Sequence, residues 1–135
     1  MTDRNTRIAR GPARILVIDD DDEVRETLCN ILRSAGFEAT AARNGKEGVR
    51  LFDAVGADAV VTDVIMPEME GIETIRELRL RRAGVKIVAI SGGGRTGVAD
   101  YLGLAKKFGA DATLSKPFNR EKLLAALSDL RAGES

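Results

Sequence analysis

The chain has 135 residues, of which 44% are hydrophobic and 31% charged, and its 21 basic and 21 acidic side chains cancel at neutral pH. These values predict one soluble globular domain and argue against a general nucleic-acid or membrane-surface binder, which would carry a basic excess. The absence of histidine excludes Ser-His-Asp triads, Cys-His pairs and histidine metal sites, so any nucleophile, acid or base is a carboxylate, a hydroxyl, a lysine or the single thiol.

The predicted elements begin after a polar N-terminal segment. Residues 1–12 carry three arginines and end in Gly-Pro, so we expect a disordered tail there, a folded domain over residues 13–132 and a short tail at 133–135. Within the domain, apolar strands alternate with segments whose apolar residues recur at helical spacing. The predicted strands are Ile15–Ile18, Phe37–Ala42, Ala59–Thr62, Ile87–Ile90 and Ala112–Ser115.

Each predicted strand is followed by a predicted helix with one apolar face. Asn44 and Glu47 form a near capping box at the start of the second helix. A glycine after each helix is expected to close it in the left-handed conformation, and these are Gly36, Gly56, Gly84, Gly109 and Gly133. The apolar faces consist of Val24, Leu28, Ile31, Leu32 and Ala35; Val49 and Phe52; Ile72, Ile75 and Leu78; Val98, Tyr101, Leu102, Ala105 and Phe108; and Leu123, Leu127 and Leu130.

The predicted strands are short and apolar on both faces, which is typical of strands covered by helices on both sides. They indicate an α/β fold with a doubly wound parallel sheet. In such sheets ligands bind beyond the carboxyl ends of the strands. The polar residues that end the strands are therefore predicted to share one crevice, and they are Asp19, Asp20, Asp63, Ser91 and Lys116.

Three of these residues, Asp19, Asp20 and Asp63, carry carboxylates that repel one another unless some are protonated or a cation is bound. Mg²⁺ suits such a group because it is a hard ion that takes oxygen ligands and keeps positions open for water and phosphate. Asp21 and Asp22 are expected to face solvent and to favour the N-terminus of the first helix. The alternative is that the whole acidic run, residues 19–22, is only a helix cap.

Asp63 is also a candidate nucleophile. A carboxylate can attack phosphorus to form an aspartyl phosphate, a step that depends on in-line positioning and charge neutralisation. Lys116 is expected to reach the phosphoryl oxygens as a point charge, and the Ser91 hydroxyl to donate a further hydrogen bond. Pro67 and Pro117 are expected to restrict the backbone after Asp63 and beside Lys116.

With these motifs the chain resembles the receiver domain of response regulators in two-component signal transduction, over about residues 13 to 132. The motifs are the acidic pair after the first strand, the segment Asp63-Val64-Ile65-Met66-Pro67 with Gly71, the strand-end Ser91, and Lys116-Pro117-Phe118. The resemblance implies a flavodoxin-like (βα)5 fold with sheet order 2-1-3-4-5, acting as a stand-alone phosphorelay domain. It also implies a phosphoacceptor at Asp63, a switch hydroxyl at Ser91, a phosphate-binding lysine at Lys116, and Mg²⁺ held by Asp19, Asp20, Asp63 and the backbone carbonyl of Ile65.

The same resemblance implies the partners. The phosphoryl donor would be a histidine on a partner kinase or phosphotransfer protein, which agrees with the lack of histidine here. Phosphorylation would shift the population toward a state that exposes the fourth helix, fifth strand and fifth helix to an unknown protein target, in a monomer or a phosphorylation-dependent dimer. The domain is expected to bind no nucleic acid or membrane directly and to catalyse only its own phosphorylation and dephosphorylation. One cysteine, no signal peptide and no membrane-length apolar stretch favour the cytoplasm.

Two features depart from the family pattern. The position three before Lys116 is Thr113 instead of the usual aromatic residue of the switch, and Tyr101 is a candidate replacement unless it only packs along its helix. The loop of residues 92–97 is glycine-rich and is expected to rearrange easily. Its spacing is that of a dinucleotide fingerprint, but its place after the fourth strand argues against this function.

Cys29 is expected to be an inert helix residue.

Two alternative functions stay open at this point. A Mg²⁺-dependent aspartate-nucleophile phosphohydrolase also uses a strand-end aspartate and a lysine, but that class typically places its nucleophile on the first strand and adds a substrate cap. A scaffold that resembles a receiver domain without being phosphorylated is the second alternative, and the intact Asp63, Lys116 and acidic pair argue against it. Turnover of a phosphate ester would favour the phosphohydrolase.

Overall fold

The computed structural model describes residues 12–64, 70–91 and 98–128 of the chain. Its sheet is parallel throughout and has five strands in the order β2-β1-β3-β4-β5, as predicted. The strands are β1 (Arg14–Ile18), β2 (Glu38–Ala42), β3 (Ala59–Asp63), β4 (Lys86–Ser91) and β5 (Ala112–Ser115). The helices are α2 (Asp22–Ser34), α3 (Gly45–Val55), α4 (Glu70–Arg81), α5 (Val98–Lys107) and α6 (Arg120–Ala126).

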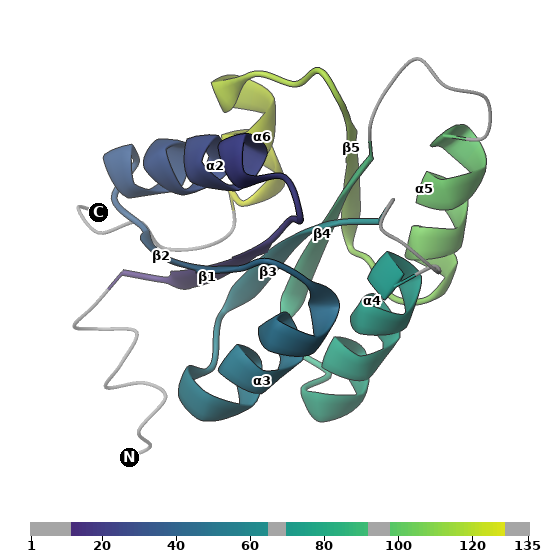
Figure 1. Ribbon diagram of the computed structural model, residues 1–135. Coiled ribbons are helices and arrows are strands. Elements are labelled where there is room, and N and C mark those ends of the chain that lie inside the picture. Colours follow the sequence, from purple (N-terminus) through teal and green to yellow (C-terminus); the bar gives the residue numbers. More distant parts are fainter. Residues whose placement is uncertain (1–11, 65–69, 92–97, 129–135) are drawn as a thin grey trace.

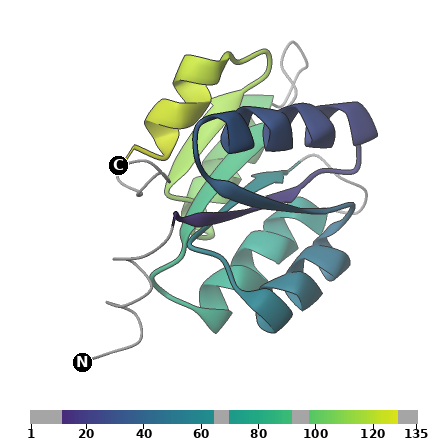
Figure 2. The ribbon, with the colours of Figure 1, turned by 90° about the vertical axis from the view of Figure 1, so that its left-hand side faces the viewer.

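The sheet lies between two layers of helices. Helices α2 and α6 cover one face, and α3, α4 and α5 cover the other (Figures 1 and 2). The apolar side chains form a separate core on each face of the sheet. One core includes Leu28, Leu32 and Leu123, and the other includes Phe52 and Ile75. None of the described helices has the length and apolar character of a membrane span.

Burial along the strands depends on their position in the sheet. The central strands β1, β3 and β4 are buried along almost their whole length, which explains why their sequences are apolar without alternation. The edge strands β2 and β5 are half-exposed. The expectation of strands apolar on both faces therefore describes the centre of the sheet better than its edges, where one neighbouring strand is missing.

Local capping signals define several helix ends. Asn44 accepts a hydrogen bond from the Glu47 backbone N–H at 2.8 Å, so the predicted cap at the start of α3 is confirmed. Gly36, Gly56 and Gly109 have φ values of 99°, 77° and 128°, a left-handed backbone that glycine adopts without steric cost.

A helix ends before Gly84 as predicted, but the expected left-handed closure at this glycine is wrong. Helix α4 ends at Arg81, and a tight turn follows in which the Val85 N–H donates to the Arg82 carbonyl at 3.3 Å, without a positive φ at Gly84. The guanidinium of Arg79 donates to the carbonyls of Ala83 and Val85, so a side chain of the helix holds the turn that follows it.

Two further expectations concern the C-terminal helices. Phe108 is 42% exposed, although it was predicted to belong to an apolar helix face; it is the residue directly after α5, which ends at Lys107. Helix α6 ends at Ala126, and both Leu130 and Gly133 lie outside the described residues.

Candidate functional site

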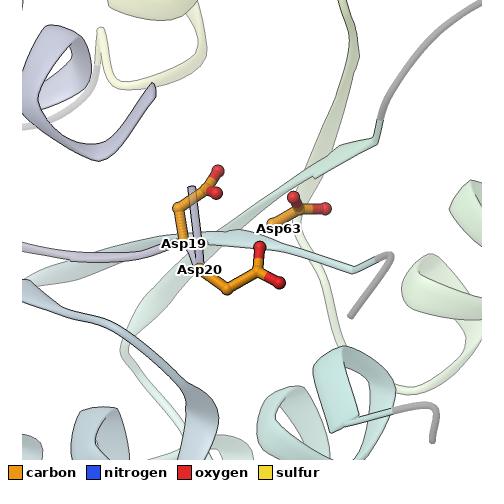
Figure 3. Close-up of side chains that lie close together, drawn as sticks. All are labelled: Asp19, Asp20 and Asp63. Carbon is orange, nitrogen blue, oxygen red and sulfur yellow. The ribbon is translucent and has the colours of Figure 1, made fainter. Parts of the chain in front are cut away.

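Three carboxylates meet at the carboxyl edge of the sheet. Asp19 and Asp20 directly follow β1, and Asp63 is the last residue of the neighbouring strand β3. Each residue offers an oxygen, and these oxygens all lie within 4.8 Å of one another. The side chains of Asp20 and Asp63 point toward the same space, with Asp19 beside them (Figure 3). The parallel register of β1 and β3 therefore brings together groups that lie far apart in the sequence.

The structure divides the acidic run of residues 19–22 into different roles. Asp19 is fully buried and its Oδ1 accepts a hydrogen bond from the Asp21 N–H at 2.9 Å. Asp21 is the N-cap of α2, where its Oδ1 accepts from the backbone N–H groups of Glu23 and Val24 at 2.9 and 3.2 Å. The interpretation of the whole run as a helix cap is thus correct only for Asp21.

Arg25 supports this turn, a role that was not predicted from the sequence. Its guanidinium donates to the backbone carbonyl of Asp19 at 2.9 Å and forms an ion pair with Asp22, one helical turn earlier. The available signal was the spacing of three residues between Asp22 and Arg25, which favours an ion pair on a helix surface. Arg25 therefore fixes the backbone between β1 and α2.

Lys116 brings a positive charge to the carboxylates. Its Nζ lies 3.4 Å from Asp63 Oδ2 and 3.7 Å from Asp19 Oδ2. The residue follows β5, and its backbone N–H donates to the Ser91 carbonyl at 2.8 Å, which continues the pairing of β4 and β5. The peptide bond between Lys116 and Pro117 is cis. The Lys116 side chain as a whole is 24% exposed, so it is not sealed inside the domain.

Burial controls the charge of Asp19. Removal from water raises its pKa from 3.8 to about 6; the hydrogen bond from Asp21 opposes this shift, the negative charge of Asp63 adds to it, and Lys116 opposes it. The Oδ2 atom of Asp19 is buried and has no hydrogen-bond donor among the described residues. A buried carboxylate oxygen next to two further carboxylates fits a hard divalent cation, which takes oxygen ligands.

Ser91 ends β4, next to the strand that carries Asp63. Its side chain is fully buried, and its Oγ has no hydrogen-bond partner in the described part of the chain. Thr113, in the place of the usual aromatic residue, is half-buried on β5 and pairs in register with Ala89. Ile65, the loop of residues 92–97 and the side chain of Tyr101 lie outside what the structure describes, so the expectations for them stay predictions.

Cys29 lies apart from the carboxylates, on the buried face of α2. Burial raises the pKa of its thiol, which outweighs the opposite effect of Arg33 and Arg25. A thiol with a raised pKa is poorly nucleophilic at neutral pH, in agreement with the expectation of an inert helix residue.

A doubly wound α/β domain with a cluster of carboxylates and a lysine at the carboxyl edge of its sheet defines a narrow class of proteins. The chain belongs to the response regulator receiver domain family, whose sequence model matches residues 15–128. It is 39% identical over 119 residues to the response regulator MprA of Mycolicibacterium vanbaalenii, an alignment that covers 88% of this chain and 50% of the relative. The chain thus spans about half the length of that regulator and of similar mycobacterial ones.

Shorter relatives match over nearly their whole length. The chemotaxis protein CheY of Listeria monocytogenes is 35% identical over 116 residues, which cover 84% of this chain and 94% of that protein. A crystal structure of a response regulator receiver domain protein from Clostridium thermocellum superposes with a TM-score of 0.78 at 31% identity, covering 87% of this chain and 92% of the other. Both the sequence and the fold therefore support the family assignment.

Proposed function

We propose that the chain is a phosphoacceptor domain that receives a phosphoryl group on Asp63. The observation that carries this proposal is the cluster of Asp19, Asp20 and Lys116 around Asp63 at the edge of the sheet. Asp63 itself is 6% exposed, so its carboxylate is held in a confined position at the edge of the sheet. Membership of the receiver family supports the same chemistry.

In the proposed reaction, a carboxylate oxygen of Asp63 forms a bond to the phosphorus of a phosphohistidine on a partner protein. The N–P bond of the donor breaks, and its electron pair stays on the imidazole nitrogen. Lys116 stabilises the negative charge on the phosphoryl oxygens, and the Ser91 hydroxyl, which has no other partner among the described residues, donates a hydrogen bond to one of them.

Asp19, Asp20 and Asp63 would hold a Mg²⁺ ion, with the Ile65 carbonyl as a further ligand. When bound, the ion neutralises carboxylate and phosphoryl charge and so favours the approach of two anionic groups. The grouping of the carboxylate oxygens supports this proposal, and so does the raised pKa of Asp19, since its burial and the nearby charge of Asp63 disfavour an ionised carboxylate that has no cation beside it other than Lys116 among the described residues.

The phosphoryl donor in this proposal is a histidine kinase or a histidine phosphotransfer protein, because the chain has no histidine of its own. The readout face consists of α5, β5 and α6, which correspond to the fourth helix, fifth strand and fifth helix of the sequence-based prediction. Lys116 directly follows β5, so a movement of Lys116 on phosphorylation would act directly on a strand of this face. Thr113 on that strand is smaller than the expected aromatic residue, and we propose that the readout differs accordingly.

The experiment is incubation of the intact protein with Mg²⁺ and acetyl phosphate, followed by intact-mass measurement. We expect addition of one phosphoryl group, no addition in excess EDTA, and no addition to Asp63→Asn. Absence of any mass increase in the wild-type protein would contradict the proposal. Sustained release of many equivalents of p-nitrophenol from p-nitrophenyl phosphate would instead favour a phosphohydrolase.

A further inference from the structure

Gly71 makes an unusually close contact with the strand that carries Asp63. It is the second residue of α4, it is buried, and it lies against the backbone of β3 where that strand ends. A Cβ atom at this position would lie 2.4 Å from the Val64 Cα and 2.7 Å from the carbonyl oxygens of both Asp63 and Val64. Ordinary van der Waals contact lies at about 3.4–4 Å, so no side chain fits without displacement of backbone atoms.

The backbone that Gly71 contacts is held from other directions as well. The Val64 N–H donates to the Ile90 carbonyl of β4 at 2.9 Å, and the Thr62 hydroxyl donates to the Asp63 carbonyl at 3.1 Å. The peptide that follows Asp63 is therefore enclosed by β4 on one side and by the first turn of α4 on the other. Its position determines where the Asp63 side chain begins.

A second helical glycine shows that this contact is specific. Gly103 in α5 is exposed, and a Cβ there would meet no atom within 4 Å. Alanine forms helices better than glycine, so helix propensity favours alanine at both positions and cannot explain a glycine at either one. At Gly71 the explanation is the space taken by the Asp63–Val64 backbone.

We propose that Gly71 is a positioning residue of the Asp63 site, an inference that rests on the proposed phosphoacceptor function. The absence of a side chain lets α4 rest on the end of β3 and holds the Asp63 carboxylate in place relative to Lys116 and the other carboxylates. A displacement of about 1 Å in a reacting group can lower a rate by about 100-fold. A methyl group at Gly71 demands a backbone displacement of this size.

The test compares Gly71→Ala with two controls, Gly103→Ala and Leu78→Ala. Gly103→Ala makes the same chemical change where there is space, and Leu78→Ala removes a fully buried side chain from the same helix, which lowers stability away from Asp63. Each variant is assayed for Tm, for Mg²⁺ affinity by calorimetry, and for the rate of phosphorylation by acetyl phosphate at saturating Mg²⁺. If a variant is partly unfolded by circular dichroism, all variants are assayed in sucrose, which stabilises folded states.

We expect Gly71→Ala to phosphorylate about 10- to 100-fold more slowly and to bind Mg²⁺ about 10-fold more weakly, whereas both controls keep wild-type values. Equal rates and affinities in Gly71→Ala and Leu78→Ala, at a similar loss of Tm, would show a purely structural role and overturn the inference. If the wild-type protein accepts no phosphoryl group, the proposed function fails, and the Mg²⁺ affinities still test the positioning role.

Discussion

The Lys116 ammonium lies 3.4 Å from a carboxylate oxygen of Asp63, although 53 residues separate the two in the chain. One residue ends β3 and the other follows β5, with β4 between these strands. The parallel sheet aligns the three strand ends, so the long side chain of Lys116 has to span only the width of β4. This arrangement places a cation directly beside the proposed phosphoacceptor.

The first prediction concerns this cation. Lys116→Gln removes the positive charge nearest to Asp63, so we expect phosphorylation by acetyl phosphate at saturating Mg²⁺ to slow by about 100-fold. The measurement is the initial rate of mass increase. Lys122→Gln, which removes an exposed charge in the first turn of α6, should keep the wild-type rate. An unchanged rate in Lys116→Gln would exclude a catalytic contribution from the ammonium.

Removal of one exposed carboxylate tests the metal site. In Asp20→Asn we expect little change in stability without Mg²⁺, because the side chain is exposed and only repulsion is relieved. In the wild-type protein, Mg²⁺ at 100 times its Kd should add about 2.7 kcal/mol to the free energy of unfolding, and this gain should largely disappear in Asp20→Asn. Urea unfolding with and without Mg²⁺ measures both the stability of the metal-free protein and the gain on Mg²⁺ binding. Asp22→Asn is the matched control, since its carboxylate lies outside the cluster.

The raised pKa of Asp19 predicts a dependence of stability on pH. Its folded-state value of about 6 lies above the ordinary 3.8, so the folded protein keeps a proton that the unfolded chain releases. The stabilisation is complete below about pH 4 and is lost as the pH rises through 6. A shift of about two units corresponds to about 3 kcal/mol.

The chain has no histidine, so few other side chains titrate between pH 5 and 8. We expect the free energy of unfolding in Mg²⁺-free buffer to fall between pH 5 and 7.5 in the wild-type protein but to stay nearly constant in Asp19→Asn. An asparagine Oδ1 can still accept the hydrogen bond from Asp21, which makes this variant a clean comparison. The same slope in both proteins would mean that another group titrates.

The cap at Asp21 has an effect on stability alone. Asp21→Ala leaves the backbone N–H groups of Glu23 and Val24 without their acceptor and should cost about 1 kcal/mol in urea unfolding. Its Mg²⁺ affinity should remain within about twofold of the wild-type value, since the carboxylate lies outside the metal-binding group. A large loss of Mg²⁺ affinity would contradict the division of roles within the acidic run.

Removal of the Ser91 hydroxyl is expected to preserve or raise stability but to weaken the response to a phosphoryl group. Its buried Oγ has no partner among the described residues, so Ser91→Ala should leave the free energy of unfolding unchanged or raise it by up to about 1 kcal/mol. If the hydroxyl senses the phosphoryl group, beryllofluoride should cause smaller NMR shifts at Thr113 in this variant than in the wild-type protein. Ser115→Ala, an exposed serine at the end of β5, should respond like the wild type.

Most of the fold was predictable because its signals are local. The central strands are continuous apolar runs that are visible in the sequence. The pair of Asn44 and Glu47 predicts the start of α3, and the structure contains the capping hydrogen bond from the Glu47 N–H to Asn44. The exception at Gly84 involves a side-chain interaction that a local pattern does not encode, and the one at Phe108 reflects where α5 ends. At the end of α4, the side chain of Arg79 accounts for the difference, because it reaches backbone carbonyls beyond the helix.

The order of residue types along the chain was enough to name the strand-end groups Asp63, Ser91 and Lys116, because short apolar runs show where buried strands stop. For the four consecutive carboxylates it left two interpretations open, a division between Asp19-Asp20 and Asp21-Asp22 or a helix cap over the whole run, since neighbouring aspartates share the same local sequence. That distinction came from the tertiary structure: the end of β1 buries Asp19, the start of α2 takes Asp21 as its cap, and β3 places Asp63 beside Asp19. The physical reason is that burial and electrostatic repulsion depend on distances across the sheet, and those distances exist only once the strands are paired.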